Sequence, residues 1–167
     1  MNSYPLTETS QRGSACYIYG LTGLVAMHED VKLSFFLKDH LGSTRVVLNS
    51  TNGVEAKFDY ETFGALREAN SSSKQAMARF RYLYTGQEFD WETGLYNYRA
   101  RLYDSDLARF YSPDPANEFF SPYVFVGNNP INRVDRSGMI SLLGARFLVG
   151  GLSTLAYTVL GAGLGAR

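Results

Sequence analysis

One short pattern recurs along this chain and limits what it can fold into: an aromatic residue and an aspartate, followed within six residues by a turn. It occurs as Phe58-Asp59 before Gly64, Phe89-Asp90 before Gly94, and Tyr103-Asp104 before Ala108. We expect each ring to pack on a sheet and each carboxylate to accept backbone N–H bonds in the turn, where glycine tolerates positive φ. A lone hairpin is marginal in water, so the units must stack on neighbours.

The aromatic content also favours strands. Twelve Tyr and eleven Phe in 167 residues are typical of pleated, half-buried surfaces. We therefore predict an all-β fold, a meander of β-hairpins, with a tight hairpin turn at Asn52-Gly53. The expected strands are Tyr17 to Tyr19, Leu24 to His28, Lys32 to Leu37, Thr44 to Asn49, Val54 to Tyr60, Arg79 to Tyr84, Gly94 to Tyr103 and Arg109 to Tyr111.

Composition argues against several functions. Sixteen basic and sixteen acidic residues cancel, which disfavours binding to nucleic acid. Cys16 is the single cysteine, and His28 and His40 cannot build a metal site by themselves, so we expect no metal and no cofactor.

We divide the chain into a loose N-terminal segment (1–16), a core (17–139) and a short apolar, Gly-rich tail (140–167). The N-terminus lacks the apolar run of a secretory signal. Pro113, Pro115, Pro122 and Pro130 predict an irregular stretch near the end of the core. Residues 147–164 carry no charge and predict a C-terminal apolar helix, which could contact a membrane, pack in a core or be the remnant of a longer effector.

The order of short motifs in the core points to one family. They are Tyr17-Ile18-Tyr19-Gly20, Asp39-His40-Leu41-Gly42-Ser43-Thr44-Arg45, Tyr84-Thr85-Gly86-Gln87-Glu88-Phe89-Asp90, Glu92-Thr93-Gly94-Leu95-Tyr96, Tyr98-Arg99-Ala100-Arg101, Ser112-Pro113-Asp114-Pro115 and Asn128-Asn129-Pro130-Ile131-Asn132. This sequence resembles the Rhs repeat-associated core, the end of the YD-repeat proteins that include bacterial polymorphic toxins and, more distantly, teneurins.

The resemblance implies a spiralled β-sheet shell that encloses a C-terminal effector, and a secreted or cell-surface location. Implied partners are the remaining YD-repeat shell, the effector, an immunity protein and secretion machinery. The alternative is an interaction or adhesion module of a cell-surface YD-repeat protein, or a truncated remnant without activity of its own.

The resemblance also implies aspartic-type autoproteolysis by Asp114 and Asp135, with cleavage after Met139. Of two neighbouring carboxyl groups, one keeps its proton as general acid and the other activates water. The sequence departs from the family pattern: the ending Asp-Pro-x-Gly-Leu reads Asp135-Arg136-Ser137-Gly138-Met139, the Gly pair after the first aspartate is absent, and the connection around Asn117 to Phe120 is shorter. Asp114 and Asp135 could instead simply cap turns.

Other candidates have simpler structural explanations. Asp39, His40 and Ser43 resemble a catalytic trio, but we interpret them as a turn, because neighbours in one loop rarely align as a triad. Arg99, Arg101 and Arg109 could bind an anion, although alternating arginines usually lie on a solvated face or against rings. We interpret Trp91 as an anchor that packs on the sheet.

Overall fold

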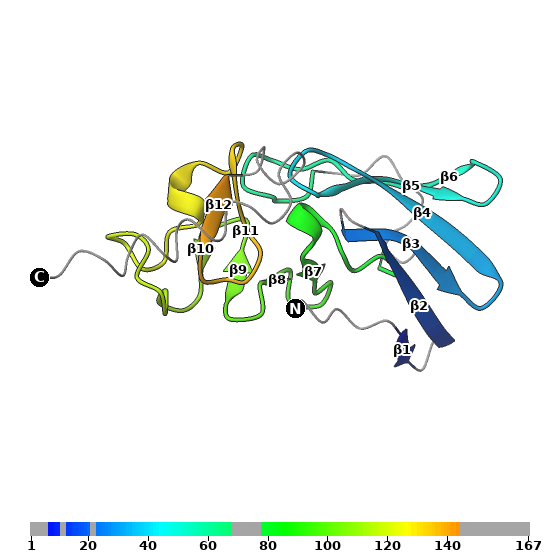
Figure 1. Ribbon diagram of the computed structural model, residues 1–167, viewed down its shortest axis with the longest axis horizontal. Helices are drawn as coiled ribbons and strands as arrows, with labels where there is room; N and C mark the ends of the chain where they lie inside the picture. The colour runs from blue at the N-terminus through cyan, green and yellow to red at the C-terminus, as the bar shows by residue number, and fades with distance from the viewer. Residues whose placement is uncertain (1–6, 11–12, 21–22, 68–77, 144–167) are drawn as a thin grey trace, which may run out of the picture.

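The computed structural model describes residues 7–10, 13–20, 23–67 and 78–143. Six antiparallel strands form one sheet in chain order, at the right of Figure 1. They are β1 (Thr7–Ser10), β2 (Gly13–Gly20), β3 (Gly23–Glu29), β4 (Lys32–Lys38), β5 (Thr44–Asn49) and β6 (Val54–Lys57). The predicted all-β meander is confirmed in this half of the chain.

Alternation along these strands separates a buried face from an exposed one. Phe36, Val47 and Ala56 lie opposite one another on β4, β5 and β6 and are buried. The other face carries exposed apolar side chains, including Ile18 and Phe35. Because side chains alternate across a strand, this register places one row in the core and leaves a second apolar row uncovered.

The sheet begins earlier than the expected loose segment 1–16 allows. Thr7–Ser10 pairs with Gly13 to Cys16, so strand structure precedes Tyr17. An edge strand can satisfy its backbone groups through the ladder alone, without the apolar alternation by which the other strands were recognised. The expectation of a loose segment was therefore wrong for these residues.

The turn between β5 and β6 also differs in detail. Asn52 has a φ of 62°, whereas Gly53 does not adopt positive φ. The turn is wider than a two-residue hairpin, because Asn49 N–H donates to the Gly53 carbonyl at 2.8 Å. The Asn49 side chain accepts the N–H groups of Thr51 and Gly53, at 3.0 and 2.7 Å. An Asx-type turn, with positive φ at Asn52 but not at Gly53, thus replaces the tight Asn-Gly turn that we expected.

Short strands and turns make up residues 78–143. A four-stranded antiparallel sheet has the order β10-β9-β8-β7, and a two-stranded sheet follows it. The elements are η1 (Tyr84–Gly86), β7 (Glu88–Phe89), β8 (Tyr96–Asn97), β9 (Leu102–Asp104), β10 (Arg109–Phe110), η2 (Val126–Asn128), β11 (Arg133–Asp135) and β12 (Ser141–Leu143). The proline-rich stretch is irregular, as predicted, whereas Arg79 to Tyr84 forms only an isolated bridge at Tyr82 before η1.

All three aromatic-aspartate units bury their rings and bend at the expected place. Phe58, Phe89 and Tyr103 are buried, and Gly64, Gly94 and Ala108 all have positive φ. Asp90 and Asp104 accept backbone N–H bonds within their turns. Asp59 differs, because its carboxylate pairs with Arg45 at 2.7 Å.

Three tyrosine hydroxyls from the second half converge on the Thr62 to Gly64 turn. Tyr84 donates to the Thr62 carbonyl at 3.1 Å, Tyr103 to Phe63 at 2.8 Å and Tyr96 to Gly64 at 3.0 Å. A Cβ at Gly64 would lie 2.4 Å from the Tyr84 ring. The core of the two halves is therefore continuous, and it is closed by hydroxyl-to-backbone bonds.

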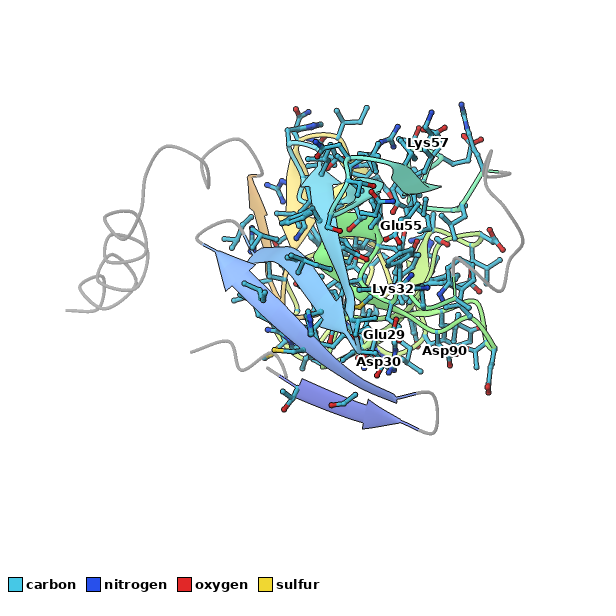
Figure 2. All side chains as sticks on the ribbon, turned by 90° about the vertical axis from the view of Figure 1, so that its right-hand side faces the viewer. Glu29, Asp30, Lys32, Glu55, Lys57 and Asp90 are labelled. Carbon is cyan, nitrogen blue, oxygen red and sulfur yellow. The ribbon has the colours of Figure 1, made fainter. Side chains whose placement is uncertain are left out.

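A cluster of charged residues, Arg79, Glu29 and Glu55, lies at the end of the six-stranded sheet that contains the β3–β4 turn. Arg79 lies 3.2 Å from Glu29 and 3.5 Å from Glu55, and its guanidinium stacks over the Phe80 ring. In Figure 2, Glu29 lies beside Asp30 of the β3–β4 turn, and Glu55 lies beyond Lys32 on the same side of the molecule. Trp91 packs edge-on against Phe89 and donates to the Phe80 carbonyl, so its predicted role as a packing anchor is confirmed.

The predicted apolar helix and the membrane contact at 147–164 lie outside the described residues. In residues 7–143, where described, no helix is long and apolar enough to cross a membrane.

Candidate functional site

Asp114 and Asp135 are brought together at one buried arginine. Both carboxyl groups are almost completely buried, at 5% and 2% exposure, and Arg101 is 4% exposed. The Arg101 Nη2 atom lies 3.6 Å from Asp114 Oδ1 and 3.4 Å from Asp135 Oδ2. A guanidinium nitrogen thus lies between the two predicted catalytic residues. The three side chains form an Asp–Arg–Asp group, in which each aspartate contacts the arginine.

Asp135 ends β11 and caps the turn that follows it. Its Oδ1 atom accepts the N–H groups of Ser137 and Gly138 at 2.9 and 2.8 Å. Burial raises the pKa of Asp135, and the opposing effects of these N–H groups and of Arg101 do not cancel that rise. A buried carboxyl group with a raised pKa holds its proton at higher pH than an ordinary aspartate, as a general acid requires.

Asp114 also caps a turn, in the irregular stretch after β10. It accepts the N–H groups of Ala116 at 3.0 Å and Glu118 at 3.1 Å. Its own N–H donates to the Pro122 carbonyl at 2.8 Å, which ties this turn to the turn at Pro122. Capping and proximity to the second aspartate therefore occur together, although the sequence presented them as alternatives.

The arginine series divides between the two positions that we expected, a solvated face and an aromatic ring. Arg99 and Arg109 are exposed, whereas Arg101 is buried and its guanidinium carbon lies 3.6 Å from the centre of the Phe110 ring. Its Nε donates to the Gly138 carbonyl at 2.5 Å and its Nη1 to the Pro122 carbonyl at 3.3 Å. The alternation of the three arginines along the sequence does not show which of them points into the core. Two aspartates predicted to be buried together require a cation nearby, however, and this requirement could have identified Arg101 as a candidate.

The predicted cleavage position after Met139 lies a few residues beyond Asp135 in the chain. Gly138 has a φ of 71°, and a Cβ there would lie 2.6 Å from the Tyr98 carbonyl oxygen. Met139 and Ile140 are exposed, at 40% and 52%. The chain then returns as β12, which pairs antiparallel with β11. The boundary drawn between core and tail after Met139 is thus crossed by a strand pair.

The Asp39, His40 and Ser43 trio forms a turn, as we interpreted it. Asp39 Oδ1 accepts the N–H groups of Leu41 and Ser43 at 3.0 and 2.9 Å. The His40 ring contacts the Ile131 carbonyl, and Ser43 Oγ accepts the Thr85 N–H. The His40 imidazole and the Ser43 hydroxyl therefore bind different backbone groups and are not paired as a catalytic triad requires.

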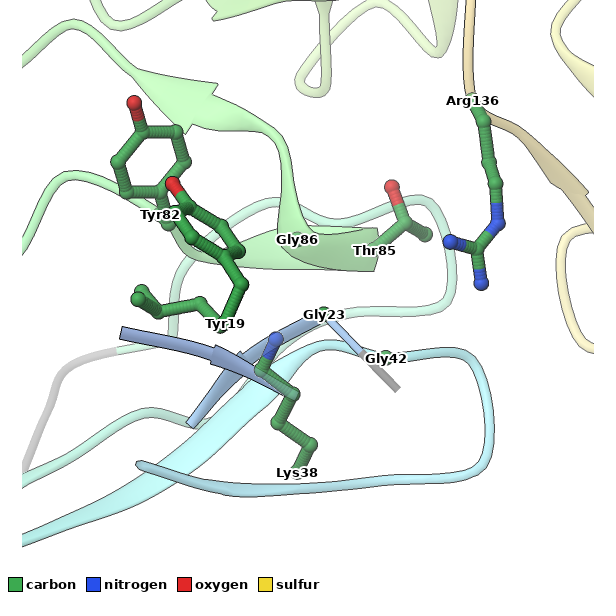
Figure 3. A pocket seen from close by; sticks show the side chains of 9 residues that line it. Tyr19, Gly23, Lys38, Gly42, Tyr82, Thr85, Gly86 and Arg136 are labelled. Carbon is green, nitrogen blue, oxygen red and sulfur yellow. The ribbon is translucent and has the colours of Figure 1, made fainter. Parts of the chain in front are cut away.

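A small pocket lies between β2–β4 and η1 (Figure 3). Its volume is about 20 Å³ and its lining includes Lys38, Thr85 and Arg136. Burial, together with the positive charge of Arg136, lowers the pKa of Lys38 to about 8. Arg136 stands where the family pattern has proline, so the departure from that pattern places a cation at this pocket.

This chain is similar in sequence to short segments of much longer known proteins. No family model matches the sequence. Salivary gland surface protein 1 of Aedes aegypti is 41% identical over 150 residues, which is 90% of this chain and 4% of that protein. The tRNA nuclease WapA of Bacillus subtilis (strain 168) is 31% identical over 139 residues, 79% of this chain and 6% of that protein. The chain thus spans about one twentieth of these relatives.

Solved structures give the same result for the fold. The crystal structure of TcdB2-TccC3-Cdc42 matches 76% of this chain and 6% of its own with a TM-score of 0.68 and 23% identity. At that identity the likeness concerns the fold alone. This chain therefore has the fold of one segment of the TcdB2-TccC3 structure, and these similarities support the Rhs-type resemblance that its motifs predict.

Proposed function

We propose that this chain is the closing segment of an Rhs-type shell and that it cuts itself after Met139, separating the shell from the chain beyond. The observation that carries the proposal is the buried group of Asp114, Arg101 and Asp135 next to the Gly138 turn. Buried charges are costly, and such groups commonly mark functional sites.

In the proposed reaction, water adds across the Met139–Ile140 peptide bond. Asp114, the partner carboxyl group at Arg101, takes a proton from the attacking water. Asp135, whose pKa is raised by burial, supplies a proton to the departing Ile140 nitrogen. The C–N bond breaks, Met139 gains the carboxylate and Ile140 gains the free amine. Arg101 binds the Gly138 carbonyl and keeps the turn beside both carboxyl groups.

Mass spectrometry of the purified chain tests the cut. We expect a product that ends at Met139 and its complement that begins at Ile140. Asp114→Asn and Asp135→Asn should each abolish both products, whereas Asp106→Asn, in the exposed turn before β10, should cleave like the wild type. A wild-type chain that stays intact over the acidic and neutral range would refute self-cleavage.

The cleavage rate should also depend on pH in a defined direction. Because the pKa of Asp135 is raised, its proton persists above the ordinary range of aspartate and is lost as the pH rises further. We therefore expect cleavage to slow as the pH rises through that raised pKa. A rate that increases steadily toward alkaline pH would contradict the role of Asp135 as the acid.

A role in the shell is supported by the uncovered face of the six-stranded sheet. Ile18, Phe35 and Leu37 are 44%, 40% and 51% exposed. Apolar rows of this kind and open strand edges suit a segment that packs against further repeats. The proposal places the chain in a secreted or cell-surface protein, with the remaining shell and the effector as its partners.

A second candidate function is surface recognition. It is favoured by the 41% identity to Salivary gland surface protein 1, which exceeds the 31% identity to WapA. A recognition module should retain its partner in a pulldown when Asp114 and Asp135 are both replaced by Asn. It should lose that partner when Phe35→Asp introduces a charge into the uncovered apolar row. Self-cleavage, by contrast, should be lost when both aspartates are replaced and should be unaffected by Phe35→Asp.

A further inference from the structure

The chain beyond the proposed cut is fixed by contacts of its own. Glu118 Oε2 accepts the Ser141 N–H at 2.7 Å, and Glu118 Oε1 accepts the Ser141 hydroxyl at 2.6 Å. Arg133 Nη1 donates to the same hydroxyl at 3.0 Å and lies 3.6 Å from Glu118 Oε1. The Glu118 and Arg133 side chains are 21% and 33% exposed. One carboxylate therefore binds a single residue, two positions after Met139, through two charge-assisted hydrogen bonds.

These anchoring residues belong to the same segments as the aspartates. Glu118 donates its backbone N–H to Asp114 Oδ2 at 3.1 Å. Arg133 begins β11, the strand that ends at Asp135, and Asp135 pairs with Ser141 across the β11–β12 ladder. A displacement of Ser141 would therefore be transmitted to both sides of the Asp114–Arg101–Asp135 group.

The junction is consequently bracketed by two fixed points. Upstream, the Gly138 carbonyl is held by Arg101, and the Gly138 N–H by Asp135. Downstream, Ser141 is held by Glu118 and Arg133. Met139 and Ile140 lie between these points and are exposed to water. Holding a scissile bond at both ends restricts it to few orientations, which raises the rate of an intramolecular reaction.

We propose that Glu118 is a positioning residue for the self-cleaving junction: it holds Ser141 and so fixes the downstream side of the Met139–Ile140 bond. It also retains β12 on β11 after that bond is cut, because neither the ladder nor the Glu118 contacts include the bond itself. The effect on cleavage rests on the proposed function, whereas the anchor at Ser141 exists in the uncut chain.

Three variants separate this role from a general effect on folding. Glu118→Ala removes both contacts to Ser141 but keeps the backbone bond to Asp114. Glu118→Gln keeps an oxygen that accepts the Ser141 N–H and offers an amide N–H to the Ser141 hydroxyl. It should therefore keep most of the anchoring of Ser141 that Glu118→Ala loses. Glu61→Ala is the matched control, because it also loses a pair with an arginine, Arg67, in the turn after β6.

Two measurements are made on the full-length chain. Hydrogen exchange of the Ser141 to Leu143 amides should be about tenfold faster in Glu118→Ala, the size expected for losing a charge-assisted bond. Cleavage should be about tenfold slower in Glu118→Ala, near normal in Glu118→Gln and unchanged in Glu61→Ala. Under native gel filtration the two wild-type products should elute together, and those of Glu118→Ala should separate.

The outcomes distinguish the two proposals. If the wild type never cleaves, the proposed function fails, and the exchange measurement alone decides whether Glu118 anchors Ser141. If Glu118→Ala cleaves and exchanges like the wild type, the inference is overturned while self-cleavage stands. If Glu118→Gln loses cleavage as completely as Glu118→Ala and both variants have a lowered Tm, Glu118 is needed for the fold, and the positioning role is likewise overturned.

Discussion

Strands β2 to β5 are six to eight residues long and form a continuous ladder, whereas β7 to β10 are two or three residues long. The long strands satisfy their backbone groups by regular pairing and bury one apolar face. The short strands are held instead by tyrosine hydroxyls, by turns with positive φ and by one buried arginine. Stability should therefore be distributed over many residues in the first region and depend on single atoms in the second.

Replacing the buried arginine should have the largest effect. Arg101→Met leaves Asp114 and Asp135 buried without their common cation, which should lower the free energy of unfolding by about 3–5 kcal/mol. Arg109→Met, on the exposed face of β10, should change it little. Urea denaturation of the uncut chain measures both. Equal effects of the two variants would show that the second region does not depend on this one side chain.

A methyl group at the tyrosine-binding turn should be the next most damaging. Gly64→Ala places a Cβ 2.4 Å from the buried Tyr84 ring, and such overpacking costs about 1–3 kcal/mol. The left-handed backbone adds about 1–2 kcal/mol. Gly94→Ala is the matched control: its φ is also positive, but nothing lies within 4 Å of the added Cβ. The difference between the two variants in the free energy of unfolding, measured by urea denaturation, gives the cost of the contact with Tyr84. Equal losses of stability in the two variants would show that this contact has no cost.

Removing one hydroxyl should have a smaller effect. Tyr103→Phe deletes the bond to the partly buried Phe63 carbonyl, so we expect a loss of about 1 kcal/mol in the free energy of unfolding. Tyr111→Phe removes the hydroxyl that contacts Asp104 at 3.3 Å from a side chain 60% exposed. Thermal unfolding should show a lower Tm for the first variant only.

A pH-dependent effect concerns Lys38, where the two regions meet. Its pKa is lowered from 10.5 to about 8 in the fold, so the unfolded chain binds more protons between these values. Stability should consequently rise as the pH increases from about 8 toward 10. Above pH 10 the raised pKa values of buried tyrosines such as Tyr98 oppose this trend, because their folded forms retain protons that the unfolded chain loses. Lys38→Met should abolish the rise, which denaturation at several pH values can measure.

The sequence predicted the long strands well and the site only in part. Period-two alternation and turn residues identified β2 to β6, because each of those signals is local. Asp114 and Asp135 were found through motif resemblance. The inward direction of Arg101 and the contact of Glu118 with Ser141 could not be predicted, because both depend on how irregular segments fold back on one another. The edge strand β1 carries no apolar pattern and was missed for that reason.

The convergence of three tyrosines on the Thr62 to Gly64 turn also bears on how the chain reaches its folded state. The bonds join residues 22, 40 and 32 positions apart. Contacts of such high sequence separation slow folding, since long loops must close before any of them forms. During synthesis the turn emerges ahead of all three tyrosines, so each tyrosine can bond to it once its own hairpin emerges. Refolding of the whole chain from denaturant lacks that order and should be slower than folding during synthesis.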